Sequence, residues 1–270
     1  MPKYIDIHAH VNFNAFKEDG KEVTQRALDN DVWFFNTGSQ LSTSKRAVNF
    51  IQDGVYAIIG LHPIHTGKSY QDEEELGFTS SEEEFNKEEY LKLAQNKKVV
   101  AIGECGLDYF RCTSESIEKQ KEAFISQIKL ANEVNKPLML HIRNNPKNEL
   151  NAYQDVLELL KKYSKVKGDV HFFAGSMKDA KDFLDFGFTL SFTGVITFTK
   201  NYDEIIKMVP NKMIMAETDS PYVAPVPHRG KRNEPLYVKE VVKRIAEIKG
   251  ISEEKMAEII VQNAKRVFDI

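Results

Sequence analysis

The chain has 270 residues, of which 41% are hydrophobic and 29% are charged, and its formal net charge at pH 7 is −3. This composition is typical of a globular protein, and the slight acidic excess excludes a protein held to nucleic acid by bulk positive charge. The N-terminal residues lack the layout of a signal peptide, no apolar run is long enough to span a bilayer, and two cysteines are too few for a disulfide framework. We therefore expect a cytoplasmic protein with no membrane partner.

Short runs rich in Val, Ile and Phe alternate along the chain with amphipathic stretches. The runs predicted to be strands cover residues 4–11, 32–39, 55–63, 99–108, 137–143, 169–175, 188–194 and 212–221. The clearest helical periodicity lies at 114–135, and two further helices are expected near 234–249 and 252–268. This alternation predicts an α/β fold, a closed TIM (β/α)8 barrel with extra C-terminal helices, formed by residues 1–270 as a single domain. An open doubly wound sheet is the alternative.

One long connection, residues 65–85, interrupts the alternation. It carries the acidic clusters DEEE at 72–75 and SSEEE at 80–84. We expect a solvated loop or the start of a helix here, in preference to a binding element.

The first predicted strand carries Asp6, His8 and His10 at every second position. Side chains at this spacing project from one face of a strand. Two imidazoles on one face suggest a metal site, because neutral imidazole is a common ligand. A pair of surface histidines in a short edge strand is the alternative.

The other histidines and several carboxylates also fall at the ends of predicted strands. Six of the seven histidines lie in or just past a strand end, and His228 follows the eighth strand in a loop. In a parallel barrel these ends open onto one face, where such enzymes place their chemistry. One histidine alone would more often be a core residue, but Glu104 in an apolar strand costs several kcal/mol unless it is paired or metal-bound. The residues predicted to converge are His8, His10, His141, His171, Glu104 and Asp219.

Four histidines and two carboxylates suit two divalent cations, zinc, manganese or magnesium, with one carboxylate bridging them. Such a pair can polarise a substrate oxygen and activate a shared water for hydrolysis of an ester, amide or phosphodiester. Cys105 adjoins Glu104 and should face away from it. Glu217, two residues before Asp219, should share its face and is a candidate for a buried partner or outer group of the metal site. No nucleophile elbow, Walker loop or dinucleotide fingerprint supports another mechanism.

Seven motifs in order, from residue 6 to beyond residue 240, resemble the TatD family of metal-dependent deoxyribonucleases. They are DIHAH, GLHP, GECGLDY, LHIRN, HFFAG, SFTG and ETDSPYVAPVPHRGKRNEP. The resemblance implies a TIM-barrel hydrolase that holds one or two divalent metals and cuts DNA. It also implies the ligands: the first metal is held by His8, His10 and Asp219, the second by His141 and His171, and Glu104 bridges them. Phe172 stands where the family usually has a small residue, and His65 is one position later than in many relatives.

The mechanism expected from this resemblance is in-line attack on phosphorus by a metal-activated water held at Glu104. Asp219 would both ligate and accept a proton from that water. His62 would donate a hydrogen bond to the phosphate. We predict that these three residues are catalytic.

Four further residues are predicted to bind the substrate. Arg143, His228 and Arg229 could hold flanking phosphates, and Tyr222 could stack on a base. The alternative for the basic cluster 228–232 is a solvated loop. The expected substrate is DNA, attacked exonuclease-like on single strands or at ends, with no obligate protein partner.

Two other functions remain open from the residues alone. The same centre could hydrolyse another substrate, such as the ester of a misacylated aminoacyl-tRNA or a cyclic amide. A non-catalytic binding protein on a former enzyme scaffold would be expected to have lost metal ligands, and none of the six is missing.

Overall fold

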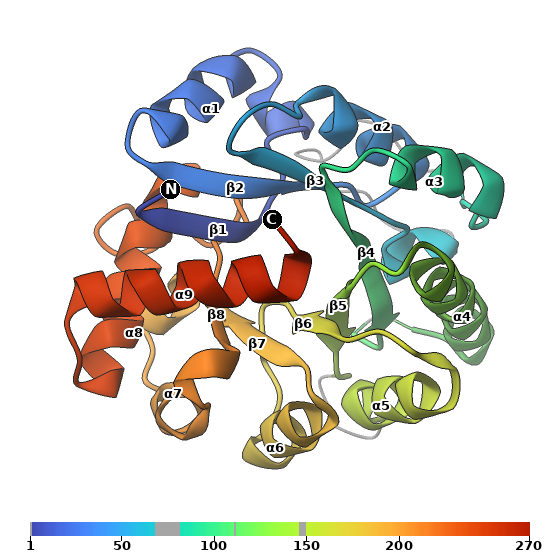
Figure 1. Cartoon of the computed structure of the whole chain (residues 1–270). Coiled ribbons are helices and arrows are strands. Elements are labelled where there is room, and N and C mark those ends of the chain that lie inside the picture. The colour runs from blue at the N-terminus through green and yellow to red at the C-terminus, as the bar shows by residue number, and fades with distance from the viewer. Residues whose placement is uncertain (1, 68–81, 111, 146–149) are drawn as a thin grey trace.

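The computed structural model describes residues 2–67, 82–110, 112–145 and 150–270. Eight parallel strands form one sheet in which spatial order follows chain order (Figure 1). The strands are β1 (Tyr4–Ala9), β2 (Val32–Thr37), β3 (Val55–Ile59), β4 (Val99–Asp108), β5 (Leu138–Arg143), β6 (Gly168–Val170), β7 (Thr189–Phe192) and β8 (Ile214–Ala216). All ten residues of β4 are buried, as expected for a parallel sheet covered by helices.

The sheet closes on itself between the first strand and the segment that follows the last. Ala9 forms a parallel bridge with Ser220. The backbone N–H of His10 donates to the Ser220 carbonyl at 2.8 Å, and that of Asp219 donates to the His8 carbonyl at 2.9 Å. The predicted TIM barrel is thereby confirmed, and the open doubly wound sheet is excluded.

Helices follow the strands and surround the barrel (Figure 1). They are α1 (Gly20–Leu28), α2 (Leu41–Asn49), α3 (Lys87–Ala94), α4 (Ser114–Val134), α5 (Ala152–Tyr163), α6 (Met177–Phe186), α7 (Asp203–Met208), α8 (Val238–Lys249) and α9 (Glu253–Phe268). The predicted helix at 114–135 matches α4, which begins after the N-cap Thr113 and ends at the left-handed Asn135. None of the helices in the described ranges is long and apolar enough to cross a membrane.

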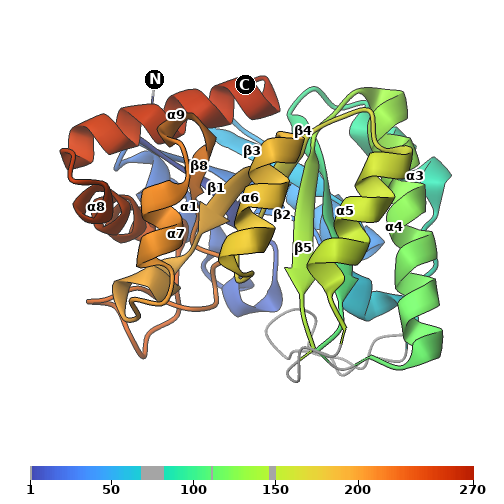
Figure 2. The same cartoon turned by 90° about the horizontal axis from the view of Figure 1, so that it is seen from below.

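The last helix covers one end of the barrel. Figure 2 shows α9 lying across the end at which the N-terminus is found. Phe268 packs edge-on against Phe35, with ring centroids 4.9 Å apart, and the Asn263 amide donates to the Ile214 carbonyl at 2.9 Å. Because α9 closes the N-terminal end, the C-terminal ends of the strands are left to form the site.

Several predicted strands are too long at their C-terminal ends. The strand predicted at 212–221 ends at Ala216, and the polar residues 217–221 that follow are buried in the loop that closes the barrel. Of the acidic segment, residues 72–81 lie outside the described residues. Within the described part, Glu83 accepts hydrogen bonds from the Leu41 N–H (3.1 Å) and the Tyr90 hydroxyl (3.3 Å).

Candidate metal centre

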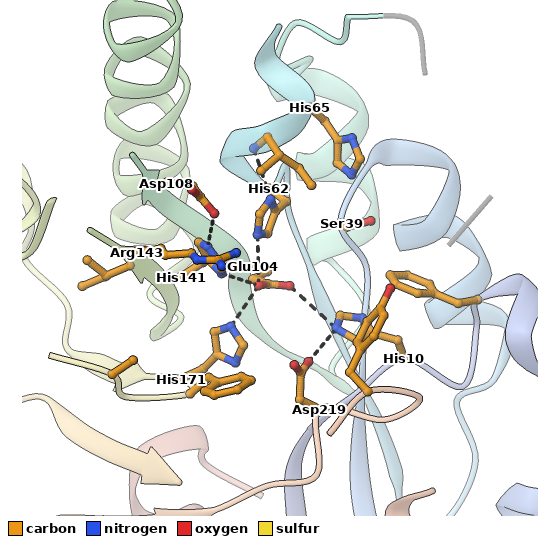
Figure 3. Close-up of a pocket in the computed structure, with 16 residues that line it drawn as sticks. His10, Ser39, His62, His65, Glu104, Asp108, His141, Arg143, His171 and Asp219 are labelled. Atoms are coloured by element: carbon orange, nitrogen blue, oxygen red, sulfur yellow. Dashed lines mark hydrogen bonds and ion pairs between the residues drawn. The ribbon is translucent and has the colours of Figure 1, made fainter. Parts of the chain in front are cut away.

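The predicted ligands converge on one cavity at the C-terminal ends of the strands (Figure 3). The cavity has a volume of about 490 Å³, within the range of small-ligand sites. His8 lies beneath its floor, fully buried, while the other five ligands predicted from the sequence line its wall. These five are His10, Glu104, His141, His171 and Asp219.

One set of four donor atoms has the spacing of a single cation site. His8 Nε2 lies 3.1 Å from His10 Nε2 and 3.4 Å from Glu104 Oε2, and His10 Nε2 lies 3.3 Å from Asp219 Oδ1. Two further pairs, His8 with Asp219 and His10 with Glu104, are 3.8 Å apart. Tetrahedral ligands with bonds of about 2.0 Å are separated by about 3.3 Å. The donor atoms therefore fit a zinc-sized cation.

The second oxygen of Glu104 faces a different set of histidines. Glu104 Oε1 lies 2.9 Å from His171 Nε2, 3.0 Å from His141 Nδ1 and 3.3 Å from His62 Nε2. The two oxygens of one carboxylate thus address two donor sets, and Figure 3 shows Glu104 between them. This is the geometry of a carboxylate able to bridge two cations.

Contacts on the far side of two rings set which nitrogen carries the proton. His10 Nδ1 lies 2.9 Å from the Thr37 carbonyl, which can only accept a hydrogen bond, so the proton is on Nδ1. His141 Nε2 lies 2.9 Å from Asp108 Oδ2. Burial opposes ionisation of Asp108, but the hydrogen bond from His141 outweighs it and lowers the pKa of Asp108 to about 2. In each ring the nitrogen that faces the cavity is therefore the one left to bind a cation, as in metal-binding histidines.

His171 is held between two carboxylates. Its Nδ1 lies 3.3 Å from Glu217 Oε1 and its Nε2 faces Glu104, yet neither nitrogen makes a well-aligned hydrogen bond. His8 Nδ1 also has no hydrogen-bond partner within the described residues. Buried polar atoms in native proteins rarely lack a hydrogen-bond partner. A cation on the cavity side would give His171 Nε2 its missing partner.

The electrostatics keep the Glu104 carboxylate charged and His62 neutral. Burial acts to raise the pKa of Glu104, but the neighbouring His62, His171 and His141 outweigh it and hold the pKa well below its usual range. Burial, assisted by His141, lowers the pKa of His62 to about 4. His62 Nδ1 accepts the Ile64 N–H at 3.1 Å, so the proton is on Nε2, which faces the cavity. His62 is therefore a neutral hydrogen-bond donor.

The loop after β8 is tied to β1 from below. Asp6 is fully buried, and its carboxylate accepts the Thr218 N–H (2.9 Å) and the Thr218 hydroxyl (2.5 Å). Asp219 follows with φ of 54°, a left-handed conformation that Asp tolerates better than most residues. These contacts bring the Asp219 carboxylate to His10. Asp6 shares a strand face with the histidines, as predicted, but lies one layer deeper.

Two of the four predicted substrate-binding residues line the cavity. Arg143 is exposed at its rim, with the guanidinium 3.7 Å above the Phe110 ring. Tyr222 lies with its ring centroid 6.3 Å from that of His10. Both positions suit contact with a substrate at the mouth of the barrel.

The basic cluster 228–232 lies outside the lining of the cavity. His228 stacks on Tyr237 at 3.7 Å, and the Arg229 guanidinium lies 4.0 Å above the Phe198 ring. Arg232 pairs with Asp19, with Nη1 and Oδ1 3.0 Å apart. The structure therefore places this cluster beside the cavity, and a role for His228 and Arg229 in substrate binding stays a prediction.

Sequence reasoning left Asp108 and Phe13 without a role. Glu104 and Asp108 are four residues apart on β4 and both line the cavity, so the alternation that singled out His8 also marks Asp108. Phe13 stacks on His10 with ring centroids 4.2 Å apart. No pattern in the sequence marked Phe13 as a residue of the site. Cys105 is buried away from the cavity, as predicted.

His65 and Phe172, two of the departures from the usual family pattern, both line the cavity. His65 is buried, with its ring centroid 6.0 Å from that of His62. Phe172 adopts φ of 45° and directs its backbone N–H to Glu217 Oε1 at 2.6 Å. Phe172 therefore adds an aromatic ring to the cavity wall next to His171.

A parallel barrel with a histidine and carboxylate cluster at its C-terminal mouth defines the class of metal-dependent hydrolases. The family model of TatD related DNases matches residues 5–269, and the chain belongs to this family. It is 39% identical to the uncharacterized metal-dependent hydrolase YabD of Bacillus subtilis over 98% of both chains. It is 32% identical to the uncharacterized metal-dependent hydrolase YcfH of Escherichia coli K12, over 98% of this chain and 96% of that one.

A solved structure agrees with this assignment. The crystal structure of YjjV, a TatD homologue from Escherichia coli K12, has a TM-score of 0.82 and 25% identity, covering 99% of this chain and 98% of that one. The predicted family is confirmed, and the protein is a metal-dependent hydrolase of the TatD family.

Proposed function

We propose that the protein hydrolyses phosphodiester bonds of DNA, acting on single strands or ends with two divalent cations. The observation that carries the proposal is Glu104, whose two oxygens face two separate donor sets at the mouth of the barrel. His8, His10 and Asp219 would hold one cation with Glu104, and His141 and His171 the other. Bound there, the cations would supply charge neutralisation for the phosphoryl oxygens and a lowered pKa for an attacking water.

The side chains around the cations have separate tasks. Asp219 lines the cavity and is 8% exposed, so a carboxylate oxygen is within reach of a water there and can accept its proton. His62 donates its Nε2–H to a phosphoryl oxygen, which is possible at neutral pH because the ring is already neutral. The proton therefore leaves the water through Asp219, and His62 orients the phosphate.

Residues at the rim suit a nucleotide. The fork of Arg143 can contact a phosphate oxygen, and Tyr222 and Phe172 offer aromatic faces to a base. His228 and Arg229 lie farther out and would contact phosphates that remain outside the cavity. We infer that residues 1–270 act as a single domain and that the setting is cytoplasmic, where DNA is available.

The test is cleavage of an end-labelled single-stranded oligonucleotide by the metal-reconstituted protein. Asp219→Asn and Glu104→Gln are each expected to lower kcat by about 100-fold or more. Asp53→Asn, which alters an exposed carboxylate paired with Lys98, is the matched control and should keep wild-type activity. EDTA should abolish cleavage, and added divalent ion should restore it.

A parallel assay on aminoacyl-tRNA separates the proposal from the alternative ester substrate. Release of the amino acid with the oligonucleotide left intact would refute DNA hydrolysis. Full cleavage by either carboxamide variant would refute the roles given to Asp219 and Glu104.

A further inference from the structure

Exposed apolar side chains gather around the mouth of the barrel. Among the residues that the structure describes, the exposed large hydrophobic side chains are Ile64 (36% exposed), Leu150 (39%), Phe198 (45%) and Val226 (45%). They follow the C-terminal ends of β3, β5, β7 and β8, respectively. Scattered surface hydrophobics are ordinary, but confinement to the loops of the site face indicates a role in contacting the ligand.

The most exposed pair forms a platform with a cation. We define the platform as Phe198, Val226 and Arg229. The Arg229 guanidinium lies 4.0 Å above the Phe198 ring, and its Nη1 donates to the Ala224 carbonyl at 3.1 Å. The Val226 N–H donates to Thr197 Oγ1 at 2.9 Å, which joins the loop after β8 to the loop after β7. Within the described part of the chain these partners of Arg229 carry no negative charge.

The platform is close to the cavity along the chain. Tyr222 lines the cavity, and Val226 is four residues further along, so at most about 14 Å of chain separates them. Asn233 fixes this loop by donating to the Tyr222 carbonyl at 2.6 Å and the Thr218 carbonyl at 2.9 Å. With about 3.4 Å between stacked nucleotides, this upper limit corresponds to at most about four nucleotides.

We propose that the platform is a second nucleotide subsite, at which an unpaired base of a single-stranded polynucleotide stacks on the Phe198–Arg229 pair. A planar cation on an exposed ring offers a base a stacking surface and an adjacent phosphate a charge. Bases inside a duplex are stacked on each other and cannot offer a free face, so the platform selects single strands. This inference rests on the proposed function, because the bound strand is the one whose phosphodiester enters the cavity.

The experiment measures binding separately from cleavage. Fluorescence anisotropy of the metal-loaded protein would use a cleavage-resistant phosphorothioate strand of 12 nucleotides, its duplex, and a dinucleotide. Phe198→Ala is expected to raise the Kd for the 12-nucleotide strand by about 5- to 100-fold. Phe198→Trp should restore binding, and the effect of Phe198→Ala should be smaller for the dinucleotide, which offers fewer nucleotides to reach the platform from the cavity.

Phe186→Ala is the matched control, because Lys167 Nζ lies 3.4 Å above the Phe186 ring at the C-terminal end of α6, the end remote from the mouth. This variant should bind the 12-nucleotide strand like the wild type. An unchanged Kd for Phe198→Ala, or an equal loss for the dinucleotide, would overturn the subsite. Failure of the wild type to bind any single strand would overturn it as well. Phe198-dependent binding without cleavage of an unmodified strand would refute the nuclease and leave the subsite standing.

Discussion

Glu217 offers the sharpest test of the metal centre, because it touches a predicted ligand without facing the cavity. It is fully buried, and its Oε1 accepts the Phe172 N–H at 2.6 Å and lies 3.3 Å from His171 Nδ1. Its Oε2 lies 3.0 Å from the Ser191 hydroxyl oxygen. In Glu217→Gln the amide oxygen can keep the contacts with the Phe172 N–H and His171 Nδ1, while the amide nitrogen faces Ser191. The hydroxyl of Ser191 retains Asp169 Oδ2 as an acceptor at 2.6 Å, so the fold should survive.

The substitution therefore removes mainly the negative charge beside His171. A charged acceptor contributes about 1.5 kcal/mol more than a neutral one, which corresponds to about a tenfold change in an equilibrium constant. We expect the Kd of the cation held by His171 and His141 to rise about tenfold, at the lower end of the range for such outer partners. Activity should return at saturating metal, because the ligands themselves are intact.

The assay is titration of the metal-free protein with zinc or manganese against a competing chelator dye, followed by activity at saturating metal. Glu234→Gln is the matched control: Glu234 is buried, and its Oε2 pairs with Arg26 Nη2 at 2.7 Å, away from the predicted ligands. This control should alter thermal stability and leave metal affinity unchanged. An unaltered affinity in Glu217→Gln, or activity that excess metal cannot restore, would refute the reasoning.

Three further predictions concern stability. Metal at 100 times its Kd should stabilise the fold by about 2.7 kcal/mol, which raises Tm by about 5 °C in calorimetry; no shift would argue against a native-state site. Gln127→Leu should cost about 1–3 kcal/mol in urea unfolding and lower kcat, because Gln127 bonds both the N–H (2.8 Å) and the carbonyl (2.9 Å) of Leu61, next to His62. Asp6→Ala should cost about 2–5 kcal/mol in the same assay, because the Thr218 N–H and hydroxyl lose their buried acceptor.

The fold was largely predictable because its signals are local. Hydrophobic periodicity predicted α4 to within a residue, and eight apolar runs gave the strands in order. The strand ends were less predictable, because residues that close the barrel after β8 are as buried as those within it. Residues 217–221 are polar in composition, and their burial follows from closure of the barrel, which their sequence does not show.

The surroundings of the site were less predictable, because they depend on partners distant in sequence. Glu217 was anticipated as a buried partner, but its contact is His171, 46 residues earlier in the chain. Arg232 stands in a basic run that suggested phosphate contacts, yet it pairs with Asp19, more than 200 residues away. Composition shows that such charges exist but does not show which of them the fold neutralises.

The strand bearing Asp6, His8 and His10 shows what alternation can and cannot decide. Alternation at every second position predicts that the three side chains lie on one face of the strand. All three are directed into the barrel and buried. Depth along the barrel axis is set by closure, because Asp6 reaches Thr218 below the mouth whereas His10 reaches Asp219 at the rim. Asp6, which resembles a ligand by its position in the alternation, therefore anchors the loop that carries the predicted ligand Asp219. Glu217 and Asp219, in the loop after β8, differ in depth in the same way: Glu217 is fully buried below the cavity, whereas Asp219 lines it.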